Sequence, residues 1–206
     1  MKAAIALLAS HEVQNFVRKI AFDLNRQYGV DFAASLKPAH ITLKQAFSFE
    51  SMERLERYFD TLAASITPFE IELDRVYHAQ WADQGFLGLN VKETGVLRKL
   101  HNRINRELCE LFEDTSAPHD GDAYHFHLTI ELGKVEGEDV YRRYYEEMRD
   151  KTVNLRFTAR YIGLAYSPGE GISESFMIYK VLGLGATDAS PASHATASLG
   201  LSRLGG

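Results

Sequence analysis

Two spacings of hydrophobic residues alternate along the chain and predict a mixture of helices and strands. Apolar residues recur at helical spacing in four segments, and elsewhere short apolar or alternating runs are typical of strands. We predict helices at 11–28, 51–65, 93–112 and 136–149, and strands at 2–9, 39–45, 69–77, 85–91, 124–131, 152–162 and 173–182. Strand and helix alternate in both halves of the chain, which predicts an α+β fold of two sandwich lobes facing each other across a cleft.

The chain is predicted to hold one folded domain followed by a tail. Residues 1–183 carry the alternating pattern, whereas 184–206 consist mostly of Gly, Ala, Ser and Leu. A segment of that composition buries too little apolar surface to offset the conformational entropy lost on folding. We therefore expect a single bilobal domain at 1–183 and a low-complexity C-terminal tail at 184–206.

One four-residue pattern occurs twice, each time in a predicted strand. His-Ile-Thr-Leu occupies 40–43 and His-Leu-Thr-Ile occupies 127–130, a separation of 127 − 40 = 87 residues. Because side chains alternate between the two faces of a strand, each His shares a face with its Thr. A single strand histidine usually has a structural role, so the repetition is what indicates function. A looser copy at 194–197 lies in the predicted tail.

The two copies supply the groups of an acid–base pair. Imidazole has a pKa of about 6.5, so one of His40 and His127 can accept a proton while the other, beside a bound phosphate, donates one. The hydroxyls of Thr42 and Thr129 are suited to hydrogen-bond the non-bridging oxygens of an anion held between the imidazoles. The sequence thus predicts phosphate chemistry at this place.

Strand alternation adds further candidates on the same face. Lys44 is predicted to bring positive charge to the phosphate, and His125 to lie beside His127 and contact the substrate. Phe86, Gly88 and Asn90 are predicted to face the cleft, and Phe86 to stack on a base, although ordinary packing explains Phe86 equally well. Trp81, in a turn-like stretch, is either a substrate platform or a loop anchor.

The paired motifs, about 90 residues apart in a chain of this size, resemble those of the 2H phosphoesterase superfamily. The likeness is greatest to its bacterial 2′-5′ RNA ligase or cyclic phosphodiesterase-like branch. The segment 162–167, followed by a strand around 179–182, is similar to the closing strands of that family, and the resemblance covers 1–183. Many relatives have Pro directly before each motif, where this chain has Ala39 and Phe126.

This resemblance implies a pseudo-twofold axis between the lobes, no metal or other cofactor, and hydrolysis of a 2′,3′-cyclic phosphate or related phosphodiester. The substrate would be a nucleotide or an RNA end. By the motif match, His40 and His127 would be the catalytic pair and Thr42 and Thr129 the phosphate ligands. We take His127 as the base and His40 as the acid, although the symmetry of the motifs does not decide between the two assignments.

Other functions remain open at this point. Ligation of RNA ends is the chemical reverse of the hydrolysis, and a non-catalytic module would bind nucleotides or RNA ends through the same residues. A metal-dependent hydrolase is a third class, since His119, His125 and His127 are ligand types that suit zinc or manganese. Turnover and sensitivity to a chelator separate these alternatives.

Composition narrows the partners and the compartment. A net charge of −5 and a pI near 5.9 argue against a surface that binds long nucleic acid through many phosphates. The single cysteine, Cys109, excludes a disulfide framework and fits a reducing cytoplasm. No apolar run approaches the roughly 18 residues of a membrane span, so we expect no membrane partner. The oligomeric state is left open.

Overall fold

The computed structural model describes residues 1–32, 34–135, 137–151, 153–167 and 176–185. In chain order these residues form β1 (Lys2–Leu8), α1 (His11–Tyr28), β2 (His40–Ser48), α2 (Met52–Ser65), β3 (Phe69–Trp81), β4 (Gln84–Val91), α3 (Gly95–Leu111), β5 (His127–Lys134), α4 (Val140–Met148), β6 (Leu155–Ala159), β7 (Tyr161–Ser167) and β8 (Met177–Gly183). Among them, no helix has the length and apolar content needed to cross a bilayer.

The eight described strands form one antiparallel sheet in the order β6-β3-β4-β5-β2-β1-β7-β8. The motif strands β2 and β5 are neighbours at its centre. The next strand outward is β1 on one side and β4 on the other, and the strand after that is β7 on one side and β3 on the other. This order confirms the predicted duplicated α+β fold, with the lobes built as two halves of one sheet. We call β2, β1, β7 and β8 the His40 half, and β5, β4, β3 and β6 the His127 half.

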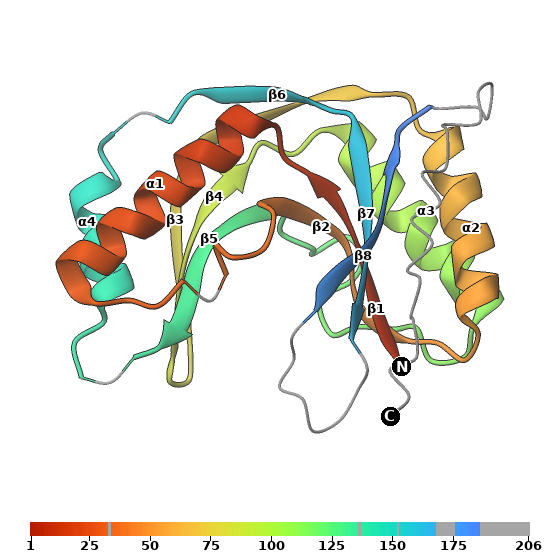
Figure 1. Ribbon diagram of the computed structural model, residues 1–206, viewed down its shortest axis with the longest axis horizontal. Coiled ribbons are helices and arrows are strands. Elements are labelled where there is room, and N and C mark those ends of the chain that lie inside the picture. Colours follow the sequence, from red (N-terminus) through yellow and green to blue (C-terminus); the bar gives the residue numbers. More distant parts are fainter. Residues whose placement is uncertain (33, 136, 152, 168–175, 186–206) are drawn as a thin grey trace, which may run out of the picture.

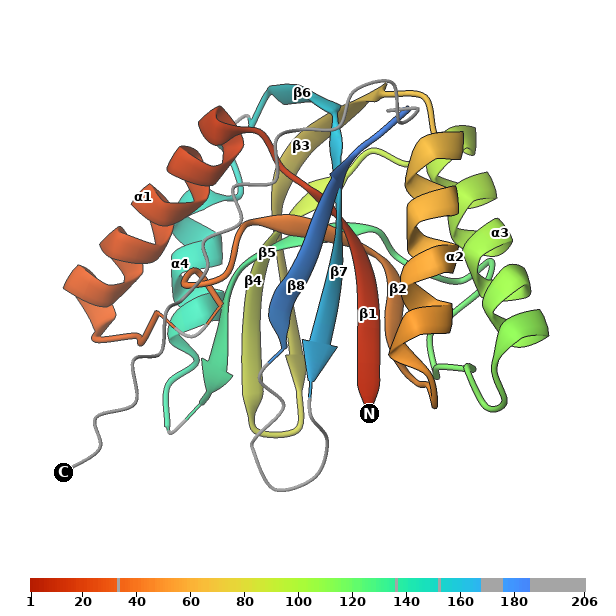
Figure 2. The same ribbon diagram turned by 45° about the vertical axis from the view of Figure 1, so that its right-hand side comes forward.

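The helices lie in two pairs beside the two halves. Helices α1 and α4 contact strands of the His127 half, and α2 and α3 contact strands of the His40 half (Figures 1 and 2). Each helix begins at a residue whose side chain accepts a backbone N–H bond, namely Ser10, Ser51, Thr94 and Asp139. Gly29 ends α1, with a φ of +69° in the left-handed region.

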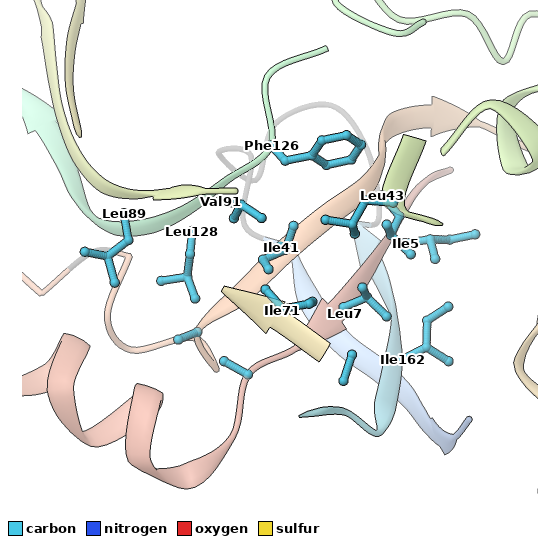
Figure 3. Close-up of a cluster of buried hydrophobic side chains, with 14 of the residues drawn as sticks. Ile5, Leu7, Ile41, Leu43, Ile71, Leu89, Val91, Phe126, Leu128 and Ile162 are labelled. Carbon is cyan, nitrogen blue, oxygen red and sulfur yellow. The ribbon is translucent and has the colours of Figure 1, made fainter. Parts of the chain in front are cut away.

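A row of buried aliphatic side chains crosses the middle of the sheet and fixes its register. Its members are cross-strand neighbours on six successive strands: Ile162, Leu7, Ile41, Leu128, Leu89 and Val76. Figure 3 labels most of them within the core cluster. Since side chains alternate, the next residue on each strand faces the other way, so a slip of one residue would bury the histidines. We call the surface opposite this row the histidine face.

Three predicted strands differ from those observed. The strand predicted at 69–77 runs on to Trp81, a residue predicted to lie in a turn-like stretch. The segment 152–162 forms two strands, because the chain leaves β3 after Ala159 and joins β1 at Tyr161 with only Arg160 between. In Figure 1, β6 crosses the top of the view and leads directly into β7. The strand predicted at 124–131 begins only at His127, because the rings of Tyr124 and Phe126 pack in the core against α3.

Two residues just past the predicted boundary at 183 contact the rest of the described chain. Leu184 is buried, and its N–H donates to the Arg160 carbonyl at 2.8 Å. The Gly185 N–H donates to the Ala63 carbonyl at 3.0 Å. The rest of the predicted tail, together with the looser motif copy at 194–197, lies outside the described residues.

Candidate active site

The centre of the sheet brings the two motifs together. Strands β2 and β5 pair antiparallel at Ile41 and Leu128. Extending that register by one residue on either side places His40 next to Thr129, and His127 next to Thr42. All four side chains are half-buried on the histidine face. The duplicated pattern therefore produces a square of two imidazoles and two hydroxyls around the pseudo-twofold axis.

Both imidazoles are held in the same orientation by the main chain. The Nδ1 atom of His40 lies 2.8 Å from the Pro38 carbonyl oxygen, and the Nδ1 atom of His127 lies 3.0 Å from the His125 carbonyl oxygen. A carbonyl can only accept, so Nδ1 carries the proton in each ring. The neutral imidazoles consequently have an unprotonated Nε2, which is the arrangement that a general base requires.

Burial lowers the pKa of both histidines below the ordinary value of imidazole. For His40, the charge of Lys37 lowers the pKa further, while the bond to Pro38 opposes the shift. For His127, the bond to the His125 carbonyl opposes the effect of burial, and the charges of His125 and His40 add to it. The environment therefore favours the neutral form of each ring in the absence of an anion.

A tyrosine that the sequence reasoning missed lies beside the Thr42 hydroxyl. Burial raises the pKa of Tyr124, the charge of Asp120 raises it further, and a hydrogen bond with Thr42 opposes them. The Tyr124 ring stacks on His101 with the centroids 4.5 Å apart. His101 is itself fixed, since its Nδ1 donates to the Leu43 carbonyl at 2.8 Å. Tyr124 precedes β5 and Thr42 lies on β2, so the two halves meet here.

Lys44 does not lie open on the histidine face, contrary to the prediction of a phosphate-binding cation. Its side chain is 1% exposed, and its ammonium group pairs with the carboxylate of Asp120. Alternation predicted that Lys44 follows Thr42 on the histidine face, but the register of β2 against β1 shifts between Thr42 and Lys44, so Lys44 pairs with the buried Ile5 and turns to the core face. The charge is neutralised locally, so Lys44 joins the halves of the sheet instead of facing a substrate.

Glu131 holds the equivalent position on β5 and has the equivalent role, since it binds the loop that precedes β2. It is four residues after His127, as Lys44 is four after His40, and it is fully buried. Its carboxylate accepts the backbone N–H groups of Ala34 at 2.5 Å and Ser35 at 3.2 Å. Each motif strand therefore anchors the loop that leads into the other motif strand.

The predicted substrate residue His125 is held by two polar side chains that have no counterpart in the His40 half. Its Nε2 lies 2.9 Å from Asn90 Oδ1, and Asn90 Nδ2 donates to Asp74 Oδ1 at 2.7 Å. Because the amide oxygen accepts, Nε2 of His125 carries a proton. The His125 side chain is exposed, with its ring centroid 6.1 Å from that of His127.

Aromatic rings cover the histidine face beside His127. The Phe86 ring meets the His127 ring edge to face at 5.1 Å, and Tyr77 and Trp81 pack against Phe86 at 5.7 and 5.5 Å. Phe86 is only 2% exposed, because these neighbours cover it, whereas Trp81 is 53% exposed. The structure thus corrects the prediction that Phe86 presents its ring face to a base, and Trp81 is the aromatic side chain open to solvent.

A glycine on β4 makes room for the Phe86 ring. A Cβ atom built on Gly88 would lie 2.6 Å from Phe86 Cζ and 2.8 Å from the Leu128 carbonyl oxygen. Any side chain at this position would therefore push Phe86 towards His127 or separate β4 from β5. Alternation alone placed Gly88 on this face but gave no sign of the close contact.

The described part of the structure does not group the residues of the metal-site alternative, and their neighbour Asp120 has another partner. Within the described ranges, no three His, Cys, Asp or Glu side chains are grouped in a way that would hold a metal ion. Asp120 pairs with Lys44, and His125 bonds to Asn90. His119 is exposed in the loop before β5.

Comparisons with known proteins indicate the same superfamily as the paired motifs do. A sequence profile of the 2′-5′ RNA ligase superfamily matches residues 9–170, which is more than half of the chain. No curated protein sequence matches significantly. The fold is similar to that of TT0787 of Thermus thermophilus, with a TM-score of 0.63, 13% identity and coverage of 90% of this chain and 98% of that one.

The fold is also similar to that of E. coli LigT in its complex with 3′-AMP. The TM-score is 0.57 and the identity 15%, over 89% of this chain and 97% of LigT. The LigT complex with NADP+ gives a TM-score of 0.53 at 17% identity, over 90% and 98%. At such identities these likenesses establish the fold, and the profile match establishes the family. The chain belongs to the 2′-5′ RNA ligase superfamily, as the resemblance of its paired motifs to those of the 2H phosphoesterases predicted.

Proposed function

We propose that this protein is a metal-independent phosphodiesterase that hydrolyses a 2′,3′-cyclic phosphate, or a related phosphodiester, of a nucleotide or an RNA end. One observation carries the proposal. His40 and His127 each donate Nδ1–H to the carbonyl two residues earlier, so both Nε2 atoms are available for proton transfer beside the hydroxyls of Thr42 and Thr129.

The reaction needs one neutral and one protonated histidine. The neutral imidazole removes a proton from water as the water oxygen attacks phosphorus in line, and a P–O bond to the ribose breaks on the opposite side. The protonated imidazole gives its proton to the departing ribose oxygen, leaving a phosphate monoester and a free hydroxyl. Each histidine ends in the other's starting state, and exchange with solvent restores both. The motif symmetry leaves open which histidine is the acid.

The threonines and the charge of the substrate complete this chemistry. The hydroxyls of Thr42 and Thr129 donate to the non-bridging oxygens, where negative charge increases in the transition state. A bound phosphodiester anion also raises the pKa of a nearby imidazole, opposing the lowering that burial causes. Binding the substrate therefore provides the protonated acid that the empty site disfavours.

The nucleoside is proposed to lie over the His127 half. Trp81 presents an exposed aromatic ring on that side, and stacking on a base is tolerant of base identity. His125 remains a predicted substrate contact, because its exposed ring adjoins His127. The E. coli LigT structure with 3′-AMP, a nucleoside monophosphate bound to a protein of this fold, is consistent with a small substrate.

The test is a panel of the four nucleoside 2′,3′-cyclic phosphates and short RNAs with 2′,3′-cyclic phosphate ends. Each is incubated with the full chain and an excess of EDTA, and the products are identified by chromatography. We expect hydrolysis to a 2′- or 3′-phosphate that EDTA does not reduce. Tight binding without product would make the protein a binding module, and activity lost to EDTA but restored by zinc or manganese would make it a metallohydrolase.

A further inference from the structure

A positively charged side chain lies on the histidine face two strands away from His127. Arg75 on β3 pairs across the sheet with Asn90 on β4, and Asn90 pairs with His127 on β5. Cross-strand partners point to the same face, so Arg75, Asn90 and His127 form one row. Two strand spacings separate the Cα atoms of Arg75 and His127 by about 10 Å. The long arginine side chain can cover part of that distance.

A local irregularity in β3 gives Arg75 this direction. The register of β3 against β4 shifts between Leu73 and Arg75, which leaves Asp74 as an extra residue. Such bulges occur next to active sites, where they redirect a side chain. Without the shift, alternation from the buried Leu73 would turn Arg75 towards the core.

The surroundings leave the guanidinium accessible. Arg75 is 70% exposed, and its Nε lies 4.0 Å from Asp74 Oδ1, at the limit of an ion pair. That same carboxylate oxygen accepts the Asn90 amide at 2.7 Å. Since Lys44 is neutralised by Asp120, Arg75 is an exposed cation on the histidine face where Lys44 is not.

The mirror position in the His40 half has no charge. Leu8 pairs with His40, and Tyr161 pairs with Leu8, so a tyrosine holds the position that matches Arg75. Two strands out from the motif strands, the His127 half therefore presents a guanidinium and the His40 half a neutral ring; the charge near His40 is that of Lys37, in the segment before β2. This difference at the matched positions gives a bound nucleotide chain a direction on the sheet.

We propose that Arg75 binds the 5′-phosphate of the nucleotide whose 2′,3′-cyclic phosphate reacts between His40 and His127. This inference rests on the proposed function and deepens it. One ribose separates the two phosphates, and the guanidinium offers several N–H donors in a planar fork that matches phosphate oxygens. The substrate class is therefore an RNA 3′ end, in which that 5′-phosphate joins the preceding nucleotide, rather than a lone cyclic nucleoside phosphate.

The test uses two probes that differ only in this group, uridine 2′,3′-cyclic phosphate and its 5′-phosphorylated form. For the natural chain, we expect kcat/KM to be about fivefold higher on the 5′-phosphorylated probe, as for a partly exposed charge-assisted contact. Arg75→Ala should reduce this ratio to about one while leaving kcat/KM on the plain probe unchanged. Arg57→Ala on α2 is the matched control, since Arg57 is 67% exposed and the charge change is the same.

A second readout is independent of the ratio. With an RNA dinucleotide that ends in a cyclic phosphate, the slope of log kcat/KM against log salt is negative and should become less negative by about 0.7 in Arg75→Ala, as expected for one lost phosphate contact. Equal loss on both probes would overturn the inference, because Arg75 would then act on the reacting phosphate. A ratio unchanged by Arg75→Ala would overturn it as well. Absence of turnover on every probe would instead refute the proposed function.

Discussion

The two halves of the sheet share their chemistry but differ in what surrounds it. His40 and His127 have the same position in their strands, the same bond to a carbonyl two residues earlier and the same neighbouring hydroxyls. Around His127, however, lie a cluster of aromatic rings and Arg75, whereas the two strands beyond His40 present Leu8, the small residues Ala6 and Gly163, and the single ring of Tyr161. Under the proposed function, duplication supplies the two proton-transfer groups, and divergence of the outer strands supplies recognition of one end of a substrate.

The largest expected effect tests the shared part of the comparison. His40→Ala and His127→Ala should each lower kcat by roughly 10²- to 10⁴-fold, because each removes one proton transfer. Groups that act as one unit are not additive, so the double variant should be little worse than either single variant. Turnover of the cyclic nucleotide panel and circular dichroism measure activity and folding. The exposed His119→Ala serves as control, and near-normal turnover in either site variant would rule out the paired mechanism.

The next effect concerns the buried anchors that join the halves. Asp120→Ala leaves the Lys44 ammonium buried without its carboxylate, and we expect a loss of about 3–5 kcal/mol in the free energy of unfolding, measured in urea. Combining Asp120→Ala with Lys44→Met should recover most of that loss. Because Lys44 is not proposed to touch phosphate, the double variant should retain kcat/KM; a loss of activity without a loss of stability would restore Lys44 as a phosphate ligand.

The pattern of hydrophobic residues was enough to predict the duplicated fold, and the repeated motif was enough to place His40, Thr42, His127 and Thr129 on one face, because period-2 alternation fixes the face of each side chain. It was not enough for Lys44 and Phe86. A register shift in β2 after Thr42 turns Lys44 to the core face, where Asp120 pairs with it, and no local pattern marks that shift. Alternation gives the direction of Phe86, but its exposure depends on Trp81 and Tyr77, which cover it.

Asn90 and Arg75 are two further residues whose positions or contacts the local sequence pattern does not predict. Alternation put Asn90 on the histidine face, but its bonds to His125 and Asp74 join three separate segments. The bulge in β3 reverses the side that alternation assigns to Arg75, and nothing in the local pattern marks it. The local pattern also does not predict that the chain stops pairing with β3 before Arg160 and pairs with β1 after it.

A smaller effect tests the asymmetry between the halves. Trp81→Ala should raise KM for nucleoside cyclic phosphates by the equivalent of about 1–2 kcal/mol, the lower part of the range for a base stacked on an aromatic ring. Tyr161→Ala, which removes an exposed ring from the His40 half, should change KM little. Steady-state kinetics on the same substrates compare the two variants. If Tyr161→Ala has the larger effect, the nucleoside lies over the His40 half and the proposed direction is reversed.

The central claim is that two histidines, one neutral and one protonated, transfer the protons without a metal. The most direct measurement is the pH dependence of kcat/KM on one nucleoside 2′,3′-cyclic phosphate, with and without excess EDTA. Burial lowers both histidine pKa values, so activity should rise through the lower value, fall above the higher one and peak below about pH 6.5. We predict this bell-shaped profile, unchanged by EDTA. A single rise towards alkaline pH that EDTA abolishes and zinc restores would contradict the account.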